Sequence, residues 1–158
     1  MQALECGMSF RKRHSAGYLV NHVARIFERG LSARIKPLGL STGTFPALLE
    51  LWEEDGLSQK QLVERLDIEQ ATMANTLSRM ERDGLIRRKT DETDRRIQRV
   101  WLTETTRDKH GAAIAAAMET NEHALAGLSP AEQAQFAELM RKLIDSFRAA
   151  QSDTDEKQ

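Results

Sequence analysis

The chain has 158 residues, of which 40% are hydrophobic and 30% charged, and its net charge is −1. This length and composition predict one soluble globular domain with a buried core, and the near-neutral charge argues against a generic polyanion binder. The single cysteine, Cys6, excludes an internal disulfide framework, and no apolar run approaches the ~20 residues that span a bilayer. No signal peptide is recognisable, so we expect a cytoplasmic protein.

Residues 1–14 lack hydrophobic periodicity and are expected to form a flexible tail. A helix is predicted over about residues 15–35, and Pro37 and Gly39 end it. Its apolar residues fall on two neighbouring stripes: Leu19, Val23, Ile26, Gly30 and Val20, Ala24, Phe27, Leu31. An apolar face of this width indicates that the helix is either deeply buried or serves both its own core and a second chain.

Three shorter helices are predicted next. The first, over about 44–54, buries Phe45, Leu48, Leu49 and Trp52. Ser58 and Gln61 form a capping-box pattern that opens the second, over about 59–66. After a tight connection at 67–69, the third runs over about 70–83. It buries Met73, Leu77 and Met80 and leaves polar, hydrogen-bonding side chains on its other faces.

A basic β-hairpin is predicted after Gly84, which caps the preceding helix. Its strands cover about 85–89 and 97–102, and a long polar turn at 90–96 joins them. Between Arg79 and Arg99 eight basic residues stand against five acidic ones, whereas from Glu119 onward eight acidic residues stand against four basic ones. The positive charge is therefore concentrated around the hairpin, although the whole chain is not basic.

Two helices are predicted in the C-terminal part. Thr103 is expected to cap a helix that runs to about residue 126, where Gly127 breaks it. Ser129, Pro130 and Glu132 form a strong helix start. The last helix carries one apolar face and frays into a tail at 151–158. That face comprises Phe136, Leu139, Leu143, Ile144 and Phe147.

A helix, a tight turn, a second helix and a basic hairpin form an arrangement that fits duplex DNA. The second helix can present polar side chains to base edges in the major groove. Arg95 and Arg96, at the hairpin tip, can extend without burying their charge, and such an arginine can enter the narrow minor groove. Asp94 is close enough to orient one guanidinium by a bidentate pair. Val100 and Leu102 are expected to fix the strand to the core.

These residues also resemble a known family. The pattern Asp94-x-Arg96-x-x-x-Val100-x-Leu102-Thr103 resembles the wing signature of MarR-type winged helix-turn-helix regulators. The segment from Leu77 to Arg88, with Gly84-Leu85-Ile86 inside it, looks like the end of that family's recognition helix and its first wing strand. The similarity covers about residues 15–150, including the order and lengths of the helices.

The resemblance implies a mainly α fold with a small β-hairpin. A winged helix-turn-helix lobe at about 41–103 would be joined to a helical dimerisation lobe formed by about 15–35 and 104–150. The protein would be a homodimer that binds a pseudo-palindromic operator in double-stranded DNA, with repression as the family's default output. Arg96 would be the minor-groove arginine and Asp94 its orienting partner. The expected DNA-binding residues are Gln70, Ala71, Thr72, Asn75, Thr76, Arg79, Arg95 and Arg96. Glu69, Asn75 and Thr106 depart from the family's usual residues.

Other classes of function find little support in the sequence. There is no glycine-rich phosphate loop and no nucleophile elbow, and the four histidines lack metal-ligand spacing, so we expect no enzyme activity, no metal and no cofactor. A helical protein-interaction module that uses the wide face of the first helix is an alternative. It gives no reason for the arginines at the hairpin tip.

Two modes of regulation stay open. Small-molecule sensing is the commoner mode in the family, and Tyr18, His22 and Trp52 are candidates to bind a small aromatic acid between the dimer helices and the DNA-binding lobe. Alternatively, Cys6 could sense oxidants if Arg11 and Lys12 lower the pKa of its thiol. An incidental thiol in the tail is the commoner situation for such a cysteine.

Overall fold

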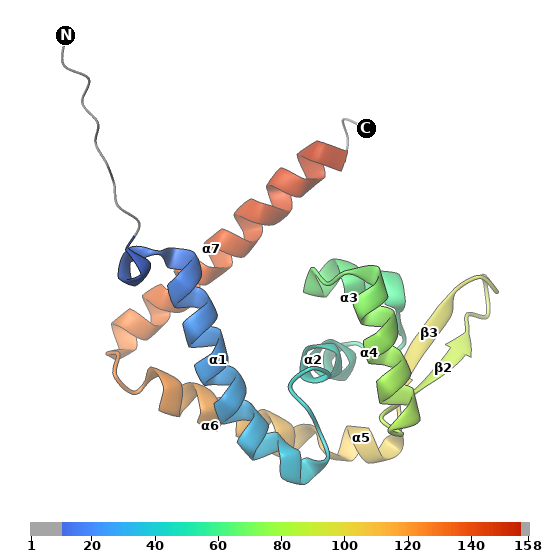
Figure 1. The fold of residues 1–158 in the computed structure, drawn as a ribbon. Helices are drawn as coiled ribbons and strands as arrows, with labels where there is room; N and C mark the ends of the chain where they lie inside the picture. The colour runs from blue at the N-terminus through green and yellow to red at the C-terminus, as the bar shows by residue number, and fades with distance from the viewer. Residues whose placement is uncertain (1–10, 156–158) are drawn as a thin grey trace. The chain divides into compact units, whose positions relative to one another are not determined.

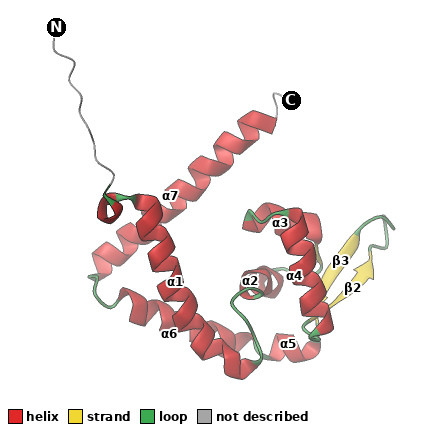
Figure 2. Cartoon of the chain, viewed as in Figure 1, coloured by secondary structure: helices red, strands yellow, loops and turns green. Residues whose placement is uncertain are grey.

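The structure, a computed structural model, describes residues 11–155, with side chains described for 11–151 (Figure 1). Helices dominate it, and a small antiparallel sheet accompanies them (Figure 2). The chain divides into two compact units, one up to Thr120 and one from Asn121 onward. No helix in the described range has the length and apolar character needed to cross a membrane.

The helices and strands have the following bounds. The α-helices are α1 (Ala16–Ile35), α2 (Phe45–Glu53), α3 (Gln59–Leu66), α4 (Gln70–Arg82), α5 (Glu104–Asp108), α6 (His110–Leu125) and α7 (Pro130–Asp155). The strands are β1 (Leu57–Ser58), β2 (Ile86–Thr90) and β3 (Gln98–Leu102), and short 3-10 turns occur at Lys12–His14 and Lys36–Leu38. The predicted fold class, mainly α with a small β-hairpin, is confirmed.

Local interactions fix both ends of α3. Ser58 Oγ accepts from the backbone N–H of Gln61 at 3.2 Å, and Gln61 Oε1 accepts from the backbone N–H of Ser58 at 2.9 Å, so the predicted capping box is present. Asp67 ends α3 with a left-handed backbone, at φ 51°. Glu69 precedes α4 and makes no side-chain cap hydrogen bond. The capping box therefore fixes the start of α3, and the left-handed Asp67 turns the chain tightly from the end of α3 into α4.

One hydrophobic core unites α2, α3, α4 and the sheet. Its fully buried large side chains are Ile35, Leu48, Leu51, Leu57, Leu62, Met73, Leu77, Met80, Ile86 and Val100. The sequence placed Leu49 and Trp52 in the core, and both are only partly buried against it. Trp52 lies at the core boundary because its indole N–H donates to the carbonyl of Thr106 at 3.2 Å.

The hairpin belongs to a sheet with the strand order β1-β3-β2. In the antiparallel β2–β3 pair, Ile86 lies opposite Leu102 and Arg88 opposite Val100. Ile86, Val100 and Leu102 are buried, so the predicted attachment of the second strand to the core is confirmed. The sequence did not predict β1, because a strand of two residues has no periodicity to detect.

The predicted helix from Thr103 to about 126 is interrupted. α5 ends at Asp108 and α6 begins at His110. Thr103 stands at the N-terminus of α5, but its hydroxyl does not cap the helix. It donates instead to the carbonyl of Gly84 at 2.8 Å, and it lies 2.9 Å from the hydroxyl of the buried Thr106. Thr103 therefore closes the turn between α4 and β2.

Most of α1 is exposed. Ile35, at its last position, is the buried residue of this helix, whereas Leu19, Val20 and Ile26 are 44%, 59% and 44% exposed. The end of α1 meets the middle of α6 through Arg34, which pairs with Glu119 at 3.3 Å. Of the two explanations for the wide apolar face, deep burial within this chain is therefore wrong.

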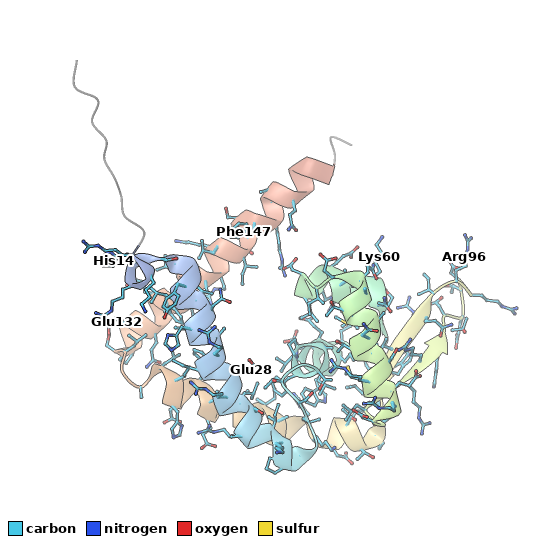
Figure 3. The ribbon with its side chains drawn as sticks, in the orientation of Figure 1. His14, Glu28, Lys60, Arg96, Glu132 and Phe147 are labelled. Carbon is cyan, nitrogen blue, oxygen red and sulfur yellow. The ribbon has the colours of Figure 1, made fainter. Side chains whose placement is uncertain are left out.

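The second unit contains the end of α6 and the long helix α7. Ser129 N donates to Glu132 Oε2 at 2.8 Å and Ser129 Oγ accepts from Glu132 N at 3.3 Å, so the predicted helix start is confirmed. The backbone N–H of Ser129, and after it the Ser129 side chain, lower the pKa of the Glu132 carboxyl. The apolar face of α7 is exposed, with Leu143 at 56% and Phe147 at 69% (Figure 3).

Gly56 offers a test of the contact between the sheet and the end of α2. Its φ is +79°, and a Cβ there would lie 2.6 Å from the ring of Trp101. We expect Gly56→Ala to lower the free energy of unfolding by more than the ~1–2 kcal/mol that left-handed backbone costs alone. Gly84→Ala is the matched control, because Gly84 has φ +72° and nothing within 4 Å of an added Cβ. Urea denaturation measures both, and equal losses would contradict a role for the Trp101 contact.

Candidate nucleic-acid interface

α4 presents a polar surface away from the core. Met73, Leu77 and Met80 are buried beneath it. Of the residues that the sequence assigned to DNA contact on this helix, five are exposed: Gln70, Ala71, Thr72, Asn75 and Arg79. Thr76 is 6% exposed and faces the core together with Leu77, so we leave it out of the proposed contact surface.

Ser78 and Arg82 lie on the same surface, although neither was among the expected DNA contacts. Helical periodicity places both beside Asn75, at three and seven residues along, and both are exposed. Ser78 donates to the carbonyl of Ala74 at 2.9 Å and accepts from Arg88 at 3.0 Å. A helical wheel centred on Asn75 would have found both residues from the sequence.

Gln70 is held at the start of α4 by α3. The amide of Gln59 donates to Gln70 Oε1 at 3.1 Å. Since Gln59 is the first residue of α3, this bond joins the N-termini of the two helices. It leaves the Gln70 side-chain N–H groups free to donate on the exposed surface.

Arg88 connects the hairpin to α4. Its guanidinium donates to Ser78 Oγ at 3.0 Å and lies 3.4 Å from Glu81 Oε2, while its backbone N–H donates to Glu81 Oε1 at 3.2 Å. The side chain crosses from β2 to the C-terminal half of α4. Arg88 therefore fixes the position of the wing relative to the polar helix.

Asp91 organises the turn at the hairpin tip, a role that the sequence did not reveal. It is 8% exposed, and its Oδ1 accepts from Thr93 N at 2.8 Å, Thr93 Oγ1 at 2.6 Å and Asp94 N at 2.9 Å. Its other oxygen pairs with Arg99. The hydroxyl of Thr93, then the guanidinium of Arg99 and the backbone N–H groups, hold the pKa of Asp91 well below its usual range. The carboxylate thus stays charged in neutral and mildly acidic solution.

Arg99 completes this arrangement. While one nitrogen pairs with Asp91, another donates to the carbonyl of Gly56 at 3.0 Å. One guanidinium thereby links the tip of the wing to the segment between α2 and β1. Arg99 is thus an internal structural residue, unlike the two arginines of the turn.

Arg95 and Arg96 lie at the exposed tip. The Arg96 side chain is 93% exposed and extends from the end of the hairpin (Figure 3). Asp94 Oδ1 accepts from the backbone N–H of Arg96 at 3.0 Å and lies 3.5 Å from its Nε. The expected bidentate pair is therefore absent here, because the Asp94 carboxylate is engaged by the backbone of the turn.

The three residues proposed to bind an effector, Tyr18, His22 and Trp52, do not line one site. Tyr18 and His22 form an edge-to-face pair with ring centroids 6.2 Å apart, and His22 lines an open hollow on α1 with Arg25, Glu28 and Arg29. Trp52 instead packs against Phe45 and His110. Cys6 lies outside the described residues. Within the described part of the chain, no group of three or more His, Cys, Asp and Glu side chains could hold a metal.

A tight turn between two helices, a polar second helix and a hairpin wing tied to it define a winged helix-turn-helix protein. Residues 40–98 match the model of the MarR family. The transcriptional regulator HosA of Escherichia coli is 34% identical over 107 residues, which cover 68% of this chain and 79% of HosA. The chain belongs to the MarR family, whose members are transcriptional regulators and not enzymes.

Two solved structures share the fold. A MarR family regulator from Listeria monocytogenes, in complex with a 26mer DNA, is 23% identical with a TM-score of 0.77, over 86% of this chain and 91% of that one. BpsR of Bordetella bronchiseptica, whose DNA binding is regulated by 6-hydroxynicotinic acid, is 24% identical with a TM-score of 0.79. The match covers 87% of this chain and 98% of BpsR.

The role of Asp91 can be tested by removing its charge. Asp91→Asn keeps one acceptor oxygen but loses the pairing with Arg99. We therefore expect the hydrogen-exchange protection of the Thr93 and Asp94 amides to fall by about tenfold. Glu92→Gln is the control, because Glu92 is an exposed acid of the same turn. Unchanged protection in Asp91→Asn would show that the turn holds its shape without this carboxylate.

Proposed function

We propose that this chain is a sequence-specific regulator that binds double-stranded DNA as a homodimer and acts as a repressor on a pseudo-palindromic operator. The observation that carries the proposal is an exposed polar face on α4 beside an ordered hairpin whose tip carries two solvent-exposed arginines. Membership of a family of transcriptional regulators supports it. Acting on chromosomal DNA, the protein would work in the cytoplasm.

α4 would read the bases. A helix of ordinary diameter fits the major groove, and the side chains on its exposed face then reach base edges. Gln70, Thr72 and Asn75 bring hydrogen-bonding groups to that face, and Arg79 brings a cation. The amides of Gln70 and Asn75 suit an adenine edge, which offers one donor and one acceptor.

The wing tip would read shape and backbone. The narrow minor groove has an enhanced negative potential that attracts an inserted arginine. Arg96, with Arg95 beside it, projects from a turn that Asp91 and Asp94 hold through backbone hydrogen bonds. A preorganised turn loses little conformational entropy on binding, so the exposed guanidinium can enter the groove at low cost. The Listeria protein of the same fold was solved in complex with DNA, which supports DNA binding as the proposed function.

A homodimer would cover the apolar surfaces that one chain leaves exposed. α1 exposes Leu19, Val20 and Ile26, and α7 exposes Leu143 and Phe147. Apolar side chains gathered on helix faces to this extent are typical of a protein–protein interface. The helical interaction module remains as the rival proposal. It uses the same surface but assigns no role to Arg95 and Arg96.

A small aromatic acid would act as the effector. BpsR, of the same fold, responds to 6-hydroxynicotinic acid, and the hollow beside His22 on α1 is lined by Arg25 and Arg29. A ligand there must favour a DNA-incompetent arrangement to have any effect. If Cys6 were the sensor instead, Cys6→Ser would abolish the response to oxidants.

Wing and helix should give different signatures in one binding experiment. The probe is the duplex that the wild-type protein selects from a random library. We expect Arg96→Ala to weaken binding by about 1–3 kcal/mol for all sequence variants of the duplex. The slope of log binding constant against log salt concentration should fall in magnitude by about one. Asn75→Ala should change the preferred base at one position of each half-site and leave the salt slope intact.

Asp94→Ala serves as the matched comparison, because it releases the wing arginine without removing its charge. It should resemble a milder Arg96→Ala, and circular dichroism controls for folding. If the wild-type protein selects no duplex from the random library, the proposed function is wrong. If Arg96→Ala binds the selected duplex with wild-type affinity at every salt concentration, the wing does not contact the DNA.

The dimer proposal predicts the result of placing a charge on α7. Leu143→Asp should abolish the dimer and destabilise the fold, because the exposed apolar face would lose its partner. Light scattering at micromolar concentration measures the mass. Gln135→Asp, an exposed polar position of the same helix, is the control and should remain dimeric. A stable folded monomer in the wild type would contradict the proposal.

A further inference from the structure

The Gln70 side chain, at the start of α4, is fixed by a residue of the neighbouring helix. Nε2 of Gln59 donates to Gln70 Oε1 at 3.1 Å and, more weakly, to the backbone carbonyl oxygen of Gln70 at 3.5 Å. A backbone carbonyl can only accept, so the nitrogen end of the Gln59 amide must face Gln70. Gln59 is therefore the donor of the pair and Gln70 the acceptor.

Gln59 is itself held in place by α3. The capping box of Ser58 and Gln61 fixes the first turn of this helix, and Gln59 is its first residue. Leu62, three residues further on, is fully buried and holds this turn against the core. Gln59 is half-buried, whereas Gln70 is exposed. A rigid donor on α3 thus ties down a side chain that would otherwise rotate in solvent.

The bond determines which groups Gln70 can present to a partner. An amide side chain has two N–H donors and one oxygen that accepts two hydrogen bonds. Gln59 occupies one acceptor position of Gln70, so both N–H groups and one acceptor position remain. Because the oxygen is tied to α3, the amide cannot exchange its two ends by turning over. Gln70 therefore offers a donor and an acceptor side by side in one fixed order.

We propose that Gln59 sets the base preference of α4: by fixing the Gln70 amide, it makes Gln70 select adenine at one position of each half-site. This rests on the proposed function, in which the exposed face of α4 enters the major groove and its N-terminal residues contact base edges. Adenine presents an acceptor at N7 beside a donor at N6, which matches the fixed amide. Guanine presents two acceptors, so the same amide would bring its oxygen against guanine O6.

Asn75 provides the contrast on the same helix. It is exposed, and no side-chain hydrogen bond within the described residues engages its amide. A base contact of Asn75 would depend on the DNA itself to order the side chain. Changes at Gln59 should therefore leave the base preference of Asn75 as it is, which makes Asn75 an internal control.

The test selects duplexes from a random library with the full chain and measures the preference at the position that Gln70 reads, which Gln70→Ala identifies. The wild type should prefer adenine there by about 5- to 150-fold. Gln59→Met keeps the length of the side chain and removes the donor. It should reduce this preference by about 2- to 10-fold, because the released amide must be ordered on binding. The preference at the Asn75 position should not change.

Gln59→Glu should reverse the bond. A carboxylate only accepts, so the N–H groups of Gln70 would turn toward it and the Gln70 oxygen would turn outward. The preference should move from adenine toward cytosine, whose N4 group is a donor, by about tenfold. Lys60→Gln is the matched control, because it also lowers the net charge by one at an exposed position of α3. Its effect should fall on all sequences alike.

A second measurement needs no DNA. Nuclear magnetic resonance relaxation of the Gln70 side-chain NH2 group should show a restricted amide in the wild type and a more mobile one in Gln59→Met. Equal mobility in the two proteins would overturn the proposal.

Three outcomes of the selection would also overturn it: a wild-type preference for another base at the Gln70 position, an adenine preference that survives in Gln59→Met or Gln59→Glu, and a Gln70→Ala variant with no change at any position. If the wild type selects no duplex although its Gln70 amide is restricted, the proposed function is wrong and the base preference falls with it. The hydrogen bond between the helices would then stand as a structural contact alone.

Discussion

The pairing of Arg99 with Asp91 is the interaction on which the wing depends. A seven-residue turn between two five-residue strands has no core of its own, so its shape must come from hydrogen bonds. Asp91 gathers two backbone N–H groups and one hydroxyl of the turn, and Arg99 connects that carboxylate to the carbonyl of Gly56. The tip is thereby held by a chain of contacts that ends next to α2. Without it, the exposed arginines would sit on a loose loop.

The basic residues of the middle segment therefore serve two purposes. Arg88 and Arg99 are engaged inside the protein, by α4 and by the turn, and their positive charge is largely neutralised by Glu81 and Asp91. Arg95 and Arg96 project into solvent. A count of charges along the sequence treats all four alike. The structure separates those that build the wing from those that are free to contact a partner.

The sequence predicted the elements whose signals are local. The capping box of α3, the start of α7 and the buried stripe of α4 depend on residues within one or two helical turns, and all three are present. Features set by distant contacts were missed. β1 forms because β3 pairs with it, and Thr103 bonds to the carbonyl of Gly84, 19 residues away, instead of capping its helix. Asp91 looked like one more acid in a polar turn, because its partner Arg99 lies eight residues away, on β3.

The order of the strands also bears on how the protein behaves at high concentration. β2 is an edge strand of a three-stranded sheet, so one row of its backbone N–H and C=O groups has no neighbouring strand. Such an edge invites a strand from another molecule to add to it. Arg87 and Lys89 place two exposed positive charges on this edge. A second copy approaching in register would bring like charges together, so the same residues that give the wing its basic character also protect the sheet from growing into an aggregate.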